Sequence, residues 1–195
     1  MTTFFYSDPH WYHHNVIEFS KRPFKDIHHM NSALIANYKK TVSEGDTVFW
    51  LGDVVLCKRD TAMQRVKGLL EKLPGDKILV PGNHDDPRIY KFFNEFHSAI
   101  LHTFEGLGDT LMVHHPVGEA NLRDVDKRYG PVYCNEGRWN TAYNKLDTIL
   151  CGHVHNTWAD GVKLMGKNLY VGVDLWNYAP VSLEELIQYK KEHMT

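Results

Sequence analysis

Five short polar segments contain the side chains of this chain that are best suited to chemistry. Each segment holds carboxylate, imidazole or carboxamide groups, and each directly follows an apolar run. The segments are Ser7-Asp8-Pro9-His10, Gly52-Asp53, Gly82-Asn83-His84-Asp85, His114-His115-Pro116 and Gly152-His153-Val154-His155. Oxygen and nitrogen donors of these types are suited to binding divalent transition metals. Together the five segments are candidates for a metal site, provided that the fold brings them together.

The apolar run in front of each segment has the length and composition of a buried β-strand. These runs are rich in β-branched and aromatic residues and are bounded by glycine or proline. They cover residues 3–6, 47–51, 77–81, 110–113 and 147–151. Polar groups at the tips of such strands converge on one edge of a sheet. The sequence therefore predicts that the five segments meet.

Helical spacing of apolar residues predicts α-helices between and after these strands. Helices are expected near residues 15–20, 30–42, 61–73 and 89–96. A last helix is expected from Ser182, where Glu185 three residues later completes a capping box. From residue 98 on, the pattern changes to short strands, expected at 99–104, 110–114, 148–151, 163–165 and 169–173.

The order of these elements predicts the fold class. Strands and helices alternate in the first half, and strands dominate the second. Such an order is typical of an α/β protein with mixed sheets covered by helices. No repeat, low-complexity tract or linker divides the chain, so a single domain over residues 1–195 is expected.

Length and composition limit the classes of function. Of the 195 residues, 43% are hydrophobic and 24% are charged, which suits one globular domain with a substantial core. The net charge of −2 argues against duplex nucleic acid or an anionic membrane as partner. The chain begins without the features of a signal peptide, and no apolar stretch approaches the roughly 20 residues that cross a bilayer. Three cysteines without close pairing fit a reducing compartment, so a cytoplasmic location is expected.

Each polar segment, taken alone, also has an ordinary structural explanation. An Asp-x-His turn is usually a local cap or a solvated pair, and Gly52-Asp53 could be a simple turn after a strand. Asparagine and aspartate in the third segment are common turn formers, and Pro116 could simply end a strand. The segment from Gly152 to His155 is the most specific, because two imidazoles follow a glycine that permits close backbone approach. Five such segments in a row favour the joint functional interpretation.

The five segments and their order resemble the signature of the calcineurin-like metallophosphoesterases. That family carries D-x-H, G-D, G-N-H-[D/E], H-x-P or a single H, and G-H-x-H. This chain matches all five between Asp8 and His155. Residues 6–10, 15–17 and 22–24 near its start, and 171–174 and 180–182 near its end, resemble a small bacterial and phage branch of phosphoesterases.

The resemblance implies a four-layer αββα sandwich, two mixed sheets flanked by helices, and a centre for two divalent metal ions. Manganese is the first candidate, with iron, zinc, nickel or cobalt as alternatives. The implied ligands of one ion are Asp8, His10 and His155. The implied ligands of the other are Asn83, His114 and His153. The carboxylate of Asp53 would bridge the two ions.

The resemblance assigns catalytic roles to Asp53 and to His84, with His84 as a general acid above the metal pair. His114 rather than His115 is the implied ligand, because it stands two residues before Pro116. There is one departure from the family: many relatives carry an aspartate three residues after the bridging one to orient the acid histidine, and here that position is Leu56. The orienting role is left to Asp85, to Asp86 or to no residue.

The implied activity is hydrolysis of a phosphodiester or phosphomonoester of a small, nucleotide-like substrate by a hydroxide that two metal ions activate. Two alternatives are a catalytically inactive interaction scaffold and a nuclease on short single strands. The long polar and aromatic segment 117–145 is expected to lie over the site. Its candidate phosphate contacts are Arg123, Arg128 and Arg138, with Tyr129, Tyr133 or Trp139 for stacking, although each of these could be an ordinary solvated loop residue. Arg22, near the first segment, could line the pocket or have a local surface role. The sequence does not indicate an oligomeric state.

Overall fold

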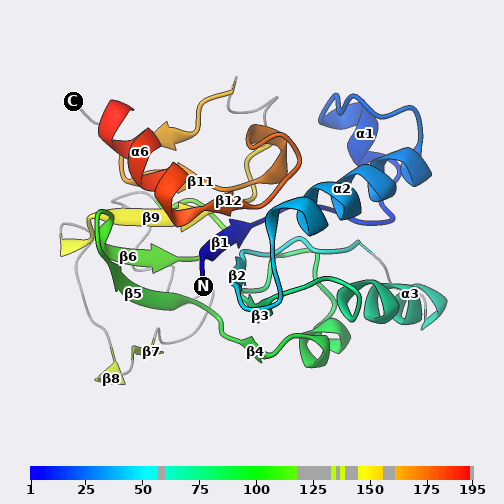
Figure 1. Cartoon of the computed structure of the whole chain (residues 1–195), viewed down its shortest axis with the longest axis horizontal. Helices are drawn as coiled ribbons and strands as arrows, with labels where there is room; N and C mark the ends of the chain where they lie inside the picture. The colour runs from blue at the N-terminus through cyan, green and yellow to red at the C-terminus, as the bar shows by residue number, and fades with distance from the viewer. Residues whose placement is uncertain (57–59, 118–132, 135–136, 139–144, 156–160, 194–195) are drawn as a thin grey trace.

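The chain forms an α/β structure with two mixed β-sheets and helices, as the element order predicts (Figure 1). The computed structural model describes residues 1–56, 60–117, 133–134, 137–138, 145–155 and 161–193. Within this part, each of the two larger sheets contains five strands.

The first sheet has the strand order β12-β1-β2-β3-β4. Its strands are β12 (Val181–Ser182), β1 (Thr3–Tyr6), β2 (Thr47–Trp50), β3 (Asp76–Leu79) and β4 (Glu95–Phe96). The strands β1 to β4 run parallel, and β12 runs antiparallel to β1. The parallel strands thus point their carboxyl ends to the same edge.

The second sheet has the strand order β10-β11-β9-β6-β5. Its strands are β10 (Leu164–Met165), β11 (Asn168–Tyr170), β9 (Thr148–Cys151), β6 (Gly108–Met112) and β5 (Ile100–Phe104). The three central strands are parallel, while β10 and β5 are antiparallel to their neighbours. A separate pair consists of β7 (Tyr133–Cys134) and β8 (Gly137–Arg138).

Four α-helices and two 3₁₀ helices fall within the described residues. They are α1 (Val16–Phe19), α2 (Ile27–Thr41), α3 (Asp60–Leu70), η1 (Pro87–Phe92), η4 (Val173–Leu175) and α6 (Leu183–His193). None of the helices in this part of the chain has the length and apolar character needed to span a bilayer.

Strand β1 shows how the layers are held together. Its side chains alternate between two hydrophobic clusters, as the two-residue period of a strand requires. Phe4 and Tyr6 join the cluster under α2 and α3, whereas Phe5 joins the cluster that contains residues of the second sheet, such as Met112 and Leu150. The first sheet therefore has α2 and α3 on one face and the second sheet on the other.

The carboxyl ends of the central strands of both sheets meet at one place. The amide of Asp8, after β1, donates to the carbonyl of Gly52, after β2, at 3.0 Å. The amide of Gly152, after β9, donates to the carbonyl of His114, after β6, also at 3.0 Å. A parallel bridge between Ser7 and Gly172 joins the two sheets at this edge. The predicted convergence of the polar segments is confirmed.

The predicted strands occur within a few residues of their expected bounds, as do the helices expected at 15–20, 30–42 and 61–73. The capping box of the last helix is also confirmed. The amide of Ser182 donates to the Glu185 carboxylate at 2.8 Å, and the amide of Glu185 donates to Ser182 Oγ at 3.2 Å. Strand β12, which immediately precedes this helix, was not expected from the sequence.

One predicted element is wrong in type, and one strand is shorter than expected. The helix expected at 89–96 is a short 3₁₀ helix followed by strand β4. Asp86 caps that 3₁₀ helix by accepting from the amide of Arg88 at 2.9 Å, and Phe96 then pairs with Leu79 in the first sheet. The strand expected at 169–173 ends at Tyr170, and the chain continues into η4. At 89–96 the pairing with β3 decides the element, which local spacing does not reveal.

Candidate metal centre

The side chains of the five polar segments form one cluster at the meeting edge of the two sheets. Three overlapping groups of possible metal-ligating atoms occur in the described residues, each with all atoms within 4.8 Å of one another. They are Asp8, His10 and His155; Asp8, Asp53 and His114; and His114, His115 and His153. All predicted ligands that carry an imidazole or a carboxylate are therefore brought together.

Asp53 lies at the centre of this cluster and is almost fully buried. Its Oδ2 atom is 3.5 Å from Nε2 of His10 and 3.4 Å from Nε2 of His114. Burial opposes ionisation of this carboxyl, but the adjacent charged imidazole of His114 outweighs burial and lowers the pKa of Asp53. Asp53 is thus an anion held between two imidazoles that come from different sheets.

We call Asp8, His10 and His155 the inner group, because all three side chains are buried. Neither ring nitrogen of His10 has a hydrogen-bond partner, although both are inaccessible to solvent. Buried polar atoms are normally paired, so an unpartnered buried imidazole calls for a specific explanation. Burial also lowers the pKa of His10 well below its usual value, which keeps the ring neutral. A neutral imidazole with a free lone pair is the form that binds a metal ion.

A buried ion pair supports the inner group from behind. Nδ1 of His155 is 2.7 Å from Oδ2 of Asp174, and the guanidinium of Arg22 donates to both oxygens of Asp174 at 2.8 Å. The same guanidinium donates to the carbonyls of Asp8 at 2.7 Å and Pro9 at 2.9 Å. A carboxylate behind a metal-ligating histidine fixes its tautomer and ring orientation. Arg22 and Asp174 therefore fix the position of this side of the cluster.

The pocket and surface roles considered for Arg22 are both wrong, because its side chain is fully buried in the ion pair. Asp174 is a site residue that the candidate ligands predicted from the sequence do not include. Its position gave a usable signal, since it is a carboxylate shortly after an apolar strand, as Asp8 and Asp53 are.

We call Asn83, His114 and His153 the outer group. His114 is fully buried, and its Nδ1 donates to the carbonyl of Leu51 at 2.7 Å, which directs the unpartnered Nε2 toward Asp53. His153 is half-buried, and Asn83 is exposed. This group is therefore more open than the inner group.

When no cation is present, the two histidines of the outer group differ in charge. Burial acts to lower the pKa of His114, but the adjacent carboxylate of Asp53 and the charge of Asp8 raise it to about 9. The pKa of His153 is lowered to about 4, by burial and by the neighbouring His114 charge. A proton on His114 thus partly offsets the negative charge of the carboxylates, a role that a bound cation could also fill.

His115 also lies close to the outer group. Its ring centroid is 4.3 Å from that of His153 and 4.8 Å from that of His114. His114 nevertheless has the closer relation to Asp53 and belongs to two of the three ligand groups. The geometry supports His114 as the residue shared between the two sides of the cluster.

Three glycines permit the close approach of the loops. A Cβ on Gly52 would collide with the backbone of Gly82, and one on Gly82 would collide with Asp53. A Cβ on Gly152 would collide with Ser7 and with a carboxylate oxygen of Asp8. The glycines of the polar segments are therefore required for packing, not only for turn conformation.

Four of the predicted ligands adopt a left-handed backbone conformation. The φ angles are 58° at Asp8, 49° at His10, 50° at Asp53 and 67° at His153. Such conformations cost roughly 1–3 kcal/mol each for residues other than glycine, and they gather at functional sites. Their presence in four separate residues of one cluster points to function rather than to fold alone.

His84 lies at the rim of the cluster, with 45% of its side chain exposed. Its Nε2 is 4.0 Å from Oδ2 of Asp53, and its amide donates to Oδ1 of the same residue at 3.0 Å. In the described residues neither candidate for orienting the ring contacts it: Asp85 accepts from the amides of Val54 and Gly82, both at 2.8 Å, and Asp86 pairs with Arg88. Asp85 therefore joins two loops and does not orient His84.

The predicted phosphate contacts of segment 117–145 cannot be placed. Arg123 and Arg128 lie outside the described residues, as do Tyr129 and Trp139. Arg138 and Tyr133 belong to the short strands β8 and β7, but their side chains lie outside the described part of the chain.

Comparison with known proteins finds relatives without an assigned activity. No family model matches the chain. An uncharacterized protein of Methanocaldococcus jannaschii is 29% identical over 185 residues, which are 93% of this chain and 87% of that protein. The Gene 66 protein of Mycobacterium phage L5 is 25% identical over 183 residues, which are 89% of this chain and 87% of that protein. A protein of unknown function from Aquifex aeolicus has a crystal structure with a TM-score of 0.69 at 24% identity, covering 96% of this chain and 98% of that one, which shows a similar fold.

Proposed function

We propose that this protein is a metal-dependent phosphoesterase of the calcineurin-like type, with two divalent ions held by the inner and outer groups. The observation that carries the proposal is the position of Asp53, an anionic carboxylate between buried imidazoles, two of which have unpartnered nitrogens. A carboxylate between two sets of nitrogen and oxygen donors has the arrangement of a bridging ligand in a two-metal site. The two packed mixed sheets with α2 and α3 on one side are compatible with the αββα sandwich of that family.

The residues present fit such a pair of ions. The inner group would hold one ion with two imidazoles and one carboxylate, and the outer group would hold the other with two imidazoles and one carboxamide. This mixed set favours manganese, iron, zinc, cobalt or nickel over calcium. Bound divalent ions would lower the pKa of a water molecule and neutralise charge on the phosphoryl oxygens.

The side chains around the two ions would then have different roles. Asp53 would keep the two groups in a fixed relation, while the buried inner group excludes bulk water from one side. His84, exposed at the rim and 4.0 Å from Asp53, is placed to donate a proton to the leaving oxygen of the ester. The exposed Asn83 and half-buried His153 leave the outer side accessible to a phosphate group.

The proposal is tested by metal analysis combined with hydrolysis assays. The purified protein should take up two divalent ions per chain and hydrolyse bis-p-nitrophenyl phosphate or p-nitrophenyl phosphate with manganese or another transition metal. Uptake of metal without hydrolysis of either ester, across manganese, iron, cobalt, nickel and zinc, would favour the interaction scaffold. Cleavage of short single-stranded oligonucleotides at a higher rate than of the small esters would favour the nuclease alternative.

A further inference from the structure

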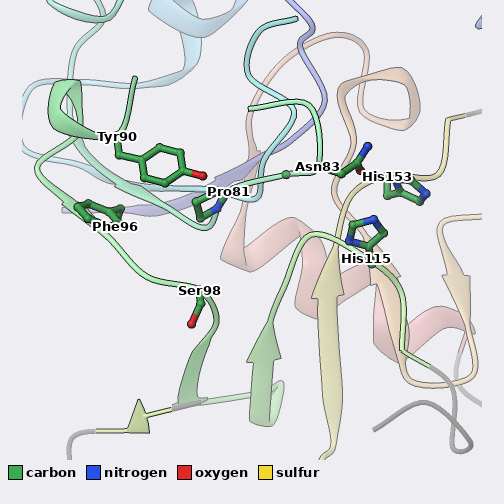
Figure 2. Close-up of a pocket in the computed structure, with 8 residues that line it drawn as sticks. Pro81, Asn83, Tyr90, Phe96, Ser98, His115 and His153 are labelled. Atoms are coloured by element: carbon green, nitrogen blue, oxygen red, sulfur yellow. The ribbon is translucent and has the colours of Figure 1, made fainter. Parts of the chain in front are cut away.

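A cavity of about 610 Å³ lies beside the outer group. Figure 2 shows Tyr90, Phe96 and Ser98 on one side of it and Asn83, His115 and His153 on the other, with Pro81 between them. Its size is within the range of pockets that bind small molecules. Because Asn83 and His153 belong to the outer group, the cavity opens directly onto the candidate metal centre.

Two aromatic rings form the wall opposite the centre. The ring centroids of Tyr90 and Phe96 lie 5.2 Å apart, with an angle of 43° between their planes. Phe96 is 55% exposed, which is unusual for a large apolar side chain with a fixed backbone. Its backbone is held by pairing of β4 with Leu79 of β3, so the ring lines the cavity from a paired strand. A planar ring can stack on one of these two side chains and contact the other at an angle.

The chemistry of the cavity wall indicates what kind of group would fit. The described residues that line it are aromatic, small, or carry an imidazole or a carboxamide, and none of them is a lysine, arginine, aspartate or glutamate. A second phosphate or another charged group would gain little binding energy there, because no oppositely charged side chain is among these residues. Ser98 can both donate and accept a hydrogen bond, which suits the polar edge of a heteroaromatic ring.

We propose that this cavity receives an uncharged planar ring carried by the phosphoester substrate, with a nucleobase as the chemical class. Tyr90 and Phe96 provide the stacking surface while the phosphate lies at Asn83 and His153. The proposal rests on the proposed function for the position of the phosphate. The assignment of the ring site depends only on the cavity and its two aromatic side chains.

The first experiment measures ring binding without phosphate or metal. Saturation-transfer NMR with adenosine should give a signal with the unmodified protein and a loss of at least about fivefold with Tyr90→Ala combined with Phe96→Ala, because stacking on an aromatic side chain contributes about 5- to 150-fold in affinity. Met165→Ala removes another exposed apolar side chain, 61% exposed, from the distant strand β10 and should leave the signal unchanged. Equal signals from all three proteins, or none from the unmodified protein, would overturn the proposal.

Two further arms make this result specific. If the double variant does not fold, Phe96→Ala alone carries the test, since its ring is largely exposed. Benzyl alcohol distinguishes a nucleobase site from a general aryl site: adenosine should bind more tightly than benzyl alcohol. The reverse order would overturn the assignment to nucleobases.

The second experiment uses two diesters with the same leaving group, the p-nitrophenyl ester of thymidine 5′-monophosphate and methyl p-nitrophenyl phosphate. The double variant should lower kcat/KM by about 5- to 150-fold for the thymidine ester, through KM, and change it less than about twofold for the methyl ester. An unchanged ratio between the two esters would contradict a nucleobase in the cavity. If neither diester is hydrolysed and p-nitrophenyl phosphate is not hydrolysed either, the proposed function fails, whereas adenosine binding still decides the cavity.

Discussion

The inner and outer groups of the centre use similar donors in different surroundings. In the inner group Asp8, His10 and His155 are buried, and the Arg22–Asp174 ion pair holds His155 and the backbone of Asp8. In the outer group Asn83 is exposed and His153 is half-buried, next to a cavity. One side of the centre is thus fixed by hydrogen bonds from behind, while the other faces the space that a substrate would enter.

This difference suggests that one group serves to bind an ion tightly and that the other makes an ion accessible to the substrate. Supporting hydrogen bonds reduce the freedom of ligands and so preorganise a site. Access requires the opposite, because a phosphate must displace solvent and approach closely. We infer that the inner group contributes mainly to metal affinity and that the outer group also contributes to substrate contact.

The largest expected effect comes from the residue that joins the two groups. Replacing Asp53 with asparagine removes the negative charge and one anionic oxygen between His10 and His114. Turnover should fall below detection, and metal content should drop from about two ions toward one or none, as elemental analysis would measure. Asp86→Asn, which removes a carboxylate paired with Arg88, is the matched control and should retain activity. Normal rates in Asp53→Asn would contradict a bridging role.

A paired substitution tests which adjacent histidine belongs to the outer group. His114→Ala should weaken binding of the second ion by more than the roughly 10–100-fold that loss of a supporting residue costs, since it removes a ligand directly. His115→Ala should leave the metal stoichiometry at two. A calorimetric titration with manganese measures both the affinity and the stoichiometry of each variant. Loss of an ion only in His115→Ala would reverse the assignment.

His84→Ala separates proton transfer from metal binding. The variant should keep both ions but hydrolyse esters roughly 10²–10⁴-fold more slowly, as loss of a general acid does. The loss should be largest for esters with a poorly acidic alcohol, because those need the proton most, and small for a p-nitrophenyl leaving group. A fall in metal content would instead identify His84 as a ligand.

The smallest expected change tests the support behind the inner group. Asp174→Asn should lower the affinity for one ion by roughly 10–100-fold and leave the other little affected. Asp85→Asn is the comparison, because it removes a buried carboxylate that joins the loops of Val54 and Gly82 on the outer side. The two variants should therefore weaken the binding of different ions. Competition between metal ions that differ in their absorption or EPR spectra can show which ion each variant affects. Equal loss of both ions in both variants would show a general loss of structure.

Much of the centre could be predicted because its ligands directly follow strands. An apolar run sets the strand, parallel pairing aligns the carboxyl ends, and the next polar residues then lie near one another. Asp8, Asp53 and His153 are all of this kind. Their convergence follows from local sequence together with the sheet order, and the structure confirms it.

The supporting contacts could not be predicted in the same way. Arg22 and Asp174 are 152 positions apart, and their pairing depends on how η4 and the loop after β1 pack. The helix predicted at 89–96 is also wrong, because Ile89, Phe92, Phe93 and Phe96 fit helical spacing although the segment is a 3₁₀ helix and a strand. The cap by Asp86 and the pairing of Phe96 with β3 override that local preference.

The left-handed backbone at Asp8, His10, Asp53 and His153 has a consequence for the stability of the protein. Glycine would relieve the unfavourable torsion at any of these positions but would remove the donor that the position presents. Such a replacement would also delete a buried or half-buried side chain with its contacts, so its main effect should be to lower the stability that a bound ion adds. The torsional strain at these four residues is therefore a cost of folding that ion binding would offset.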